Sequence, residues 1–174
     1  ISETFDEKKL TLMHFTQESD ILHFIYILPF SHNRALVEST VFSKNVFDEI
    51  WFREKINDYL KLNNINKFKE HGKEKGVIPM FFSDVAKPLN NNIVNIGTAG
   101  GWTKPSTGYT FRFIDKFSDR TIEFLKLDKS FKKFKIKNRF WFYDLIFIDV
   151  LYYNNSLGSN IFQRMFEKNK FKSI

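Results

Sequence analysis

A glycine-rich stretch, IVNIGTAGGWTKPSTGYTF from Ile93 to Phe111, constrains the fold of this chain more than any other feature. It holds four of the seven glycines and one of the four prolines of the 174-residue sequence. The apolar residues Ile93, Val94 and Ile96 predict a short strand. The glycines Gly97, Gly100 and Gly101 then let the backbone turn sharply and approach a ligand closely. We expect a strand, a tight turn and then a helix.

The second half of this stretch predicts where that helix begins. Pro105 interrupts regular structure, and Ser106 or Thr107 can cap the helix that follows. The first N–H groups of such a helix lack internal partners, so they suit a phosphate or a flavin carbonyl. A plain strand-turn-helix corner explains the spacing equally well, because GxAGG is much weaker than a full phosphate-binding signature.

The composition indicates one ordinary globular domain. Hydrophobic residues make up 43% of the chain and charged residues 27%, and the formal net charge is +7. This charge suits nucleic acid or an anionic membrane, although the abundance of Phe, Lys, Asn and Ile is also typical of AT-rich coding sequences. Because the chain has no cysteine and its four histidines lack ligand spacing, we expect neither a disulfide nor a metal site.

The order of apolar segments predicts a three-stranded antiparallel sheet followed by helices, an α+β fold. The expected strands are Leu10 to Phe15, Leu22 to Leu28 and Arg34 to Phe42, with a polar turn at residues 17–20. Helical spacing predicts a covering helix from Asn45 to Leu62. The later segments are a returning strand within Phe68 to Met80, a loop from Asp84 to Asn92, and helices from Phe111 to Leu125, Phe140 to Tyr153 and about Leu157 to Glu167.

Glu38 is the first candidate for chemistry. Strand alternation places it on one face with Leu36, Thr40 and Phe42. A carboxyl group in an apolar pocket stays protonated near neutral pH more readily, and it can then act as a general acid. The alternatives are that this face meets solvent, or that Glu38 pairs with a Lys or Arg.

Three sequence strings together resemble the lycopene cyclase family, whose relatives are flavin-dependent hydroxylases and geranylgeranyl reductases. They are FIYILPFSHNRALVESTVF from Phe24 to Phe42, EKGVIPM from Glu74 to Met80, and IGTAGGWTKPSTGYTF from Ile96 to Phe111. The resemblance implies the C-terminal part of a two-domain, FAD-binding flavoprotein. Residues 1–92 would form the substrate-binding sheet with its helix, and residues 93–174 the flavin-contacting segment and C-terminal helices. The dinucleotide-binding part would lie outside this sequence, which would make the chain a fragment.

The resemblance also implies a reaction, a non-redox cyclisation of lycopene end groups to β-ionone rings. Glu38 matches the family's acid/base residue, and Glu74 matches a second acidic position, although a surface charge explains Glu74 equally well. Reduced FAD is the implied cofactor. Its implied contacts are Gly97, Thr98, Ala99, Gly100, Gly101, Pro105, Ser106, Thr107 and Gly108. Thr98 stands where the related hydroxylases carry an acidic residue, which argues against a hydroxylase.

A basic stretch from Lys132 to Arg139, followed by the aromatic residues 140–143, predicts contact with a membrane surface. We therefore expect a cytoplasmic protein peripheral to the membrane, with lycopene or a related linear carotenoid as substrate. An ordinary buried helix at Phe140 to Tyr153 is the alternative. Two other functions remain open: an isoprenoid reductase or hydroxylase of the same flavoprotein fold, and a basic module that binds single-stranded nucleic acid without catalysis.

Overall fold

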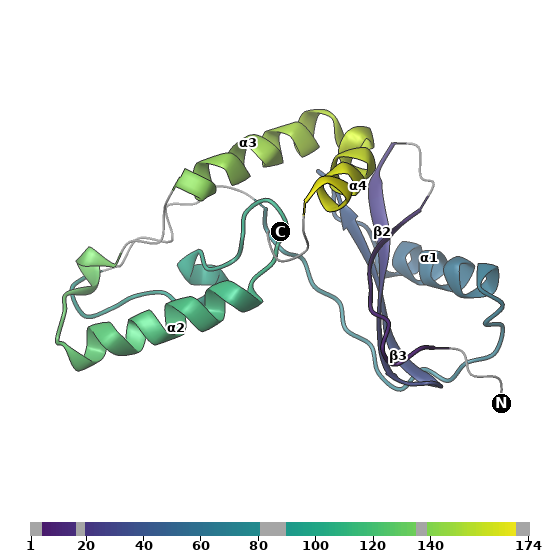
Figure 1. Ribbon diagram of the computed structural model, residues 1–174, viewed down its shortest axis with the longest axis horizontal. Helices are drawn as coiled ribbons and strands as arrows, with labels where there is room; N and C mark the ends of the chain where they lie inside the picture. The colour runs from purple at the N-terminus through teal and green to yellow at the C-terminus, as the bar shows by residue number, and fades with distance from the viewer. Residues whose placement is uncertain (1–4, 17–19, 81–89, 135–138, 170–174) are drawn as a thin grey trace. The chain divides into compact units, whose positions relative to one another are not determined.

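The computed structural model describes residues 5–16, 20–80, 90–134 and 139–169 (Figure 1). The chain divides into two compact units, residues 1–77 with 151–174, and residues 78–150. The described fold is α+β, with a three-stranded sheet and four α-helices, as predicted. The elements are β1 (Thr11–Phe15), β2 (Leu22–Ser31), β3 (Arg34–Phe42), α1 (Glu49–Leu62), α2 (Phe111–Lys126), α3 (Arg139–Tyr153) and α4 (Gly158–Lys168), with short 3₁₀ turns η2 (Gly97–Gly100), η3 (Phe131–Lys133) and η4 (Asn155–Leu157).

The sheet of the first unit is antiparallel in the order β1-β2-β3, which confirms the predicted strands. Strand β2 is central and is the most deeply buried element, because both of its faces are partly covered. Residue pairs such as Leu22 with Phe42 and Tyr26 with Glu38 fix the register between β2 and β3. The predicted turn at residues 17–20 lies mostly outside the described residues.

Helix α1 covers one face of the sheet (Figure 1). The buried His23 of β2 lies 5.1 Å from the Trp51 ring of the helix, centroid to centroid. Its ring nitrogens share hydrogen bonds with the hydroxyls of Thr16 (2.7 Å) and Ser39 (2.8 Å). The helix begins at Glu49, later than the predicted Asn45, because Asp48 accepts a hydrogen bond from the backbone N–H of Trp51 and caps it.

Helix α4 packs against the opposite face of the sheet. Phe162 of α4 is almost fully buried and lies 5.9 Å from the ring of Phe42. Gly158 begins the helix where a Cβ would lie 2.6 Å from the Leu22 side chain, so a larger residue would not fit there without movement. The side chain of Asn155 accepts from the Leu22 N–H and donates to the Phe42 carbonyl, which ties this turn to the ends of β2 and β3.

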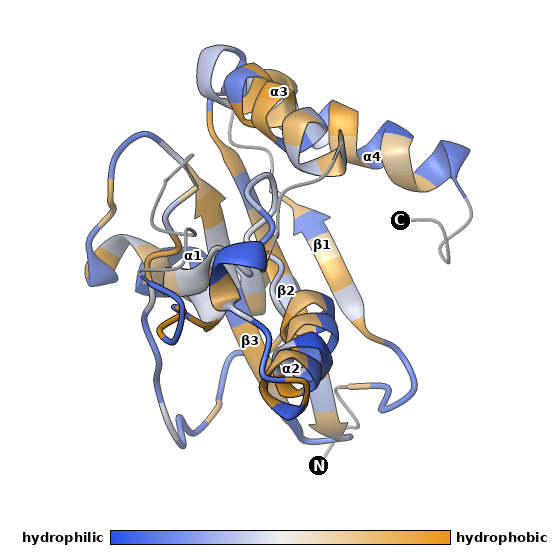
Figure 2. Cartoon of the chain, turned by 90° about the vertical axis from the view of Figure 1, so that its left-hand side faces the viewer, coloured by the Kyte–Doolittle hydropathy of each residue, from blue (hydrophilic) through white to orange (hydrophobic). Residues whose placement is uncertain are grey.

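An aromatic core holds the second unit together. It consists of the buried residues Trp102, Phe117, Phe124, Phe131 and Phe134. Helix α2 has the predicted extent, but its buried face differs from the predicted one. Phe117 and Phe124 are buried. The helical spacing of Phe111, Ile114, Phe117 and Leu125 predicts one core-facing stripe, but Phe111, Ile114 and Leu125 are exposed. Figure 2 shows hydrophobic residues along most of α3, and both hydrophobic and hydrophilic residues along α2.

Two predicted strands are absent from the described residues. In residues 65–80 no regular structure forms, and side chains of the segment pair with α1 instead, through Arg53 with Glu70 and Glu49 with Lys73. The Lys73 ammonium lowers the pKa of Glu49. Residues 93–96 are also not a strand, because their backbone bonds are local: Asn90 accepts from the Ile93 N–H, and the Ile96 carbonyl accepts from Gly100.

Candidate functional site

The glycine-rich segment opens with a tight turn rather than with a strand and a helix. Gly97 and Gly101 bracket the 3₁₀ turn η2 and both have positive φ, at 61° and 72°. The turn is closed by hydrogen bonds from the N–H groups of Gly100, Gly101 and Trp102 to carbonyls at 96–98. Among the described residues, the N–H groups of Gly97, Thr98 and Ala99 come before these donors and take no part in these three bonds.

The glycines of this segment serve different purposes. A Cβ on Gly100 would lie 2.2 Å from the carbonyl oxygen of Asn95, so glycine is needed there for a close approach within the chain itself. Gly97 differs, because a Cβ built on it would meet nothing within 4 Å. The outer surface at Gly97, with the exposed side chains of Thr98 and Ala99, is therefore the part of the turn that a ligand could approach.

Trp102 follows this turn and is 3% exposed. Among the described residues its indole nitrogen has no hydrogen-bond partner. The ring packs against Phe117 at a centroid distance of 5.7 Å and so anchors the turn to α2. The glycine-rich segment is thus fixed from its inner side by aromatic packing.

Ser106 does not cap a helix, contrary to the prediction. Its side chain is buried, and its hydroxyl donates a 2.6 Å hydrogen bond to Oδ1 of Asp144 in α3. The ammonium of Lys104 lies 3.7 Å from the same carboxylate oxygen. Thr107 is not the cap either, because α2 begins four residues later with Thr110 at its N-cap and no side-chain capping bond. Asp144 was not predicted as a partner of this segment, although a carboxylate inside a strongly apolar helix is a signal that the sequence contains.

The end of the motif EKGVIPM, from Ile78 onward, contacts the glycine-rich segment within the second unit. Gly108 has φ 72°, and a Cβ built on it would lie 3.3 Å from two atoms of the Ile78 side chain. This contact brings together two of the three strings on which the family resemblance was based. Pro105 and Thr107 lie beside it and are partly buried.

Glu38 lies on an open part of the sheet, not in an apolar pocket. Its pairing with Tyr26 places it on the face that carries Phe24 and Phe42, which confirms the predicted alternation. Burial along this face falls with distance from α4: Phe42 is 7% exposed, whereas Leu36 is 44% exposed and Glu38 is also exposed. One oxygen of Glu38 accepts a 2.9 Å hydrogen bond from the Thr40 hydroxyl.

Glu74 lies in the irregular segment 65–80 and is exposed. Its neighbour Lys73 pairs with Glu49 of α1. Glu38 and Glu74 both belong to the first unit, and the described residues record no hydrogen bond or ion pair between them. The glycine-rich segment belongs to the second unit.

Residues 1–130 match the family model described as lycopene cyclase protein. This match covers the sheet, α1, the glycine-rich segment and α2. No curated protein and no solved structure gives a significant match to the chain. Since the family match covers most of the sequence, the chain belongs to the lycopene cyclase family. Membership supports a carotenoid cyclase enzyme of carotenoid biosynthesis, in a family that is generally flavin-dependent.

Helix α3 has an exposed aromatic surface near its beginning. Phe140, Phe142 and Tyr143 are 60%, 57% and 58% exposed. The lysines Lys132 and Lys133 precede it in η3, while residues 135–138 of the predicted basic stretch lie outside the described residues. No helix in the described part of the chain combines the length and the apolar character required to cross a bilayer.

Proposed function

We propose that this chain is the substrate-binding and flavin-contacting part of an enzyme that cyclises lycopene, or a related linear carotenoid, to β-ionone rings without net redox change. The position of Glu38 is the main observation that supports this proposal. It is an acidic residue within the matched family region, and it lies on an open sheet face beside Tyr26 and Leu36. A hydrocarbon end group can lie on such a face and reach the carboxyl group.

Glu38 is proposed as the general acid. A polyene end group on this face would replace the water around the carboxyl group with hydrocarbon, and apolar surroundings favour the neutral, protonated form of a carboxyl group. That form can give its proton to the terminal double bond. The resulting carbocation closes a six-membered ring, and loss of a proton to a base completes the reaction with no change in oxidation state. Glu74 is the second candidate for this acid/base work.

Apolar neighbours of Glu38 would protect the carbocation. Leu28 and Leu36 are paired directly across β2 and β3 on the same face, two residues further along each strand from Tyr26 and Glu38. Side chains without lone pairs cannot trap the cation, and they exclude the water that would otherwise add to it. The phenol ring of Tyr26 adds an electron-rich surface close to the carboxyl group.

Reduced FAD is the cofactor we propose, and it would supply an electron-rich surface that stabilises the positive charge. The residues present fit such a group along the outer side of η2. Gly97 leaves open space on its outer side, and the amides of Gly97, Thr98 and Ala99 can donate to an acceptor. Gly100, Gly101 and Gly108 would shape this edge, and Pro105, Ser106 and Thr107 would hold the following loop in position.

We also propose that the complete enzyme has a dinucleotide-binding part outside this sequence, and that it is cytoplasmic and associates with the membrane surface. Lycopene is insoluble in water, so the substrate must come from a bilayer. The exposed Phe140, Phe142 and Tyr143 of α3, with basic residues before them, form the type of surface that binds lipid interfaces.

Product analysis tests this proposal. The complete protein, supplied with lycopene and reduced flavin, should give cyclic carotenes with the same number of hydrogen atoms as the substrate. A hydroxylated or a saturated product, without any cyclic carotene, would assign the chain to a hydroxylase or a reductase instead.

A further inference from the structure

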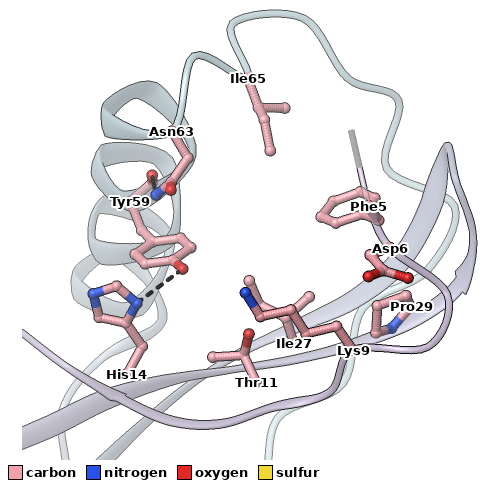
Figure 3. Close-up of a pocket in the computed structure, with 10 residues that line it drawn as sticks. All are labelled: Phe5, Asp6, Lys9, Thr11, His14, Ile27, Pro29, Tyr59, Asn63 and Ile65. Atoms are coloured by element: carbon pink, nitrogen blue, oxygen red, sulfur yellow. Dashed lines mark hydrogen bonds between the residues drawn. The ribbon is translucent and has the colours of Figure 1, made fainter. Parts of the chain in front are cut away.

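A pocket on the α1 side of the sheet is not used by the proposed reaction. It has a volume of about 410 Å³ and lies between β1, β2 and the end of α1 (Figure 3). Its lining residues are Phe5, Asp6, Lys9, Thr11, His14, Ile27, Pro29, Tyr59, Asn63 and Ile65. Ile27 and Glu38 point to opposite faces of the sheet, because Glu38 pairs with Tyr26 and strand neighbours alternate. The pocket is therefore separate from the Glu38 site.

The walls of the pocket are held in place by hydrogen bonds. The Phe5 N–H donates to the carbonyl of His32 at 3.0 Å, and the His32 N–H donates to Glu7 at 3.1 Å, so the segment before β1 is tied to the turn between β2 and β3. On the other side, the Asn63 side chain donates to the Tyr59 carbonyl at the end of α1. The pocket thus lies within one unit, and contacts within the chain itself hold its walls.

One end of the pocket gathers hydrogen-bond donors. Lys9 extends along the floor with its ammonium nitrogen pointing into the pocket, and the hydroxyl groups of Thr11 and Tyr59 also point inward (Figure 3). The described residues record no ion pair for Lys9. Tyr59 shares a 3.2 Å hydrogen bond with Nδ1 of His14, and burial raises the pKa of Tyr59, which keeps the phenol protonated.

The opposite end of the pocket is apolar apart from one carboxylate. Phe5, Pro29 and Ile65 form its walls, and the buried Ile27 lies on the floor of the pocket beside Thr11, with which it pairs. Asp6 lies at this end, where one of its oxygens accepts a hydrogen bond from the Lys8 N–H. A second negative charge on a ligand would be repelled by Asp6 and would lack a cation, because the lining offers one lysine and no arginine.

We propose that this pocket binds a small monocarboxylate with an apolar body, a molecule of the fatty-acid type. The carboxylate would lie against the Lys9 ammonium and the hydroxyls of Thr11 and Tyr59, and the hydrocarbon would lie against Phe5, Ile27 and Ile65. Charge-assisted hydrogen bonds would orient the head group, and apolar burial would supply most of the affinity. This inference does not depend on the cyclase reaction.

Four probe molecules distinguish the contribution of the carboxylate head group from that of the apolar body of the ligand. Octanoate, 1-octanol, acetate and octyl phosphate are each titrated into the ¹⁵N-labelled 174-residue chain, with amide chemical shifts as the readout. Octanoate should give saturable shifts at Thr11, His14 and Tyr59. Octanol should bind about fivefold to tenfold more weakly, acetate should not saturate, and octyl phosphate should bind no tighter than octanoate.

Two variants test whether the ammonium group of Lys9 binds the carboxylate of the ligand. Lys9→Met keeps the apolar stem but removes the ammonium group, so octanoate should then bind as weakly as octanol does. Lys8→Met is the matched control, because Lys8 is an exposed neighbour that does not line the pocket. The proposal is wrong if octanoate and octanol bind equally, if both variants have the same effect, or if octanoate shifts residues of α3 instead of the pocket.

Discussion

The hydroxyl of Ser106 donates a 2.6 Å hydrogen bond to Asp144, a carboxylate that α3 holds with 13% of its side chain exposed. This bond joins the glycine-rich segment to a helix nearly 40 positions further along the sequence. It also explains why a strongly apolar helix keeps an acidic residue. The second unit owes the position of its candidate flavin-contacting loop to this polar contact as well as to its aromatic core.

Replacing Asp144 by Leu should destabilise the chain. The buried Ser106 hydroxyl would lose its acceptor and Lys104 its ionic partner, at a cost of about 1–3 kcal/mol. Asp149→Leu is the control, since Asp149 lies on the same helix and is exposed. Urea unfolding of both variants measures the difference. Equal stability of the two variants would show that the Ser106 contact contributes nothing.

Alanine substitutions at Gly100 and, as a control, at Gly72 test the tight turn of the glycine-rich segment. Gly100→Ala places a Cβ 2.2 Å from the Asn95 carbonyl oxygen, so the turn must shift, at about 1–3 kcal/mol. Gly72→Ala adds a methyl group where nothing lies within 4 Å, and it should be neutral or slightly stabilising. Thermal unfolding compares them. A Gly100→Ala protein as stable as the Gly72→Ala protein would contradict the tight turn.

His23 should be needed for the stability of the first unit. His23→Leu leaves the hydroxyls of Thr16 and Ser39 without their ring partner and should cost about 1–3 kcal/mol. His71→Leu is a suitable control, because His71 is exposed in the irregular segment. Denaturant unfolding is again the measurement. If the two variants unfold at the same denaturant concentration, the buried hydrogen bonds do not stabilise the sheet.

Membrane binding can be tested by charge. Changing Lys132, Lys133, Lys135 and Lys137 to Gln should weaken flotation with anionic vesicles by roughly 1 kcal/mol per charge near the surface, without lowering thermal stability. A control with the same change in net charge replaces the exposed Lys61, Lys67, Lys69 and Lys75. The peripheral-membrane proposal fails if both sets act alike, or if the unchanged protein does not float with vesicles.

Local sequence patterns predicted the elements whose own residue spacing is enough to specify their secondary structure. The three strands and helices α1, α2, α3 and α4 follow from alternation and helical spacing, and the structure confirms them within a few residues. Residues 93–96 and 68–80 have apolar patterns typical of strands, yet a strand needs a neighbour to pair with. The Ile93 N–H instead bonds to the nearby Asn90, and Lys73 pairs with Glu49 of α1. No pattern within either segment reveals these partners.

Only those residues of the candidate site that match the family's motifs were predicted from the sequence. Glu38 was assigned to the correct sheet face, but its exposure depends on which other segments cover that face, and no pattern in β3 contains that information. Asp144 and the pocket beside Tyr59 depend on contacts between distant segments. The resemblance to the lycopene cyclase family is confirmed by the match over residues 1–130. The roles of Glu38, Glu74 and the glycine-rich segment stay predictions.

The most direct test of the proposed reaction is the turnover of lycopene by the complete protein carrying Glu38→Gln. Gln keeps the shape of the side chain but has no acid proton, so cyclic product should fall by about 10²- to 10⁴-fold while folding and flavin content stay unchanged. Glu54→Gln, an exposed change on α1, should leave turnover intact. If the Glu38→Gln protein instead cyclises lycopene at a near-normal rate, Glu38 is not the general acid.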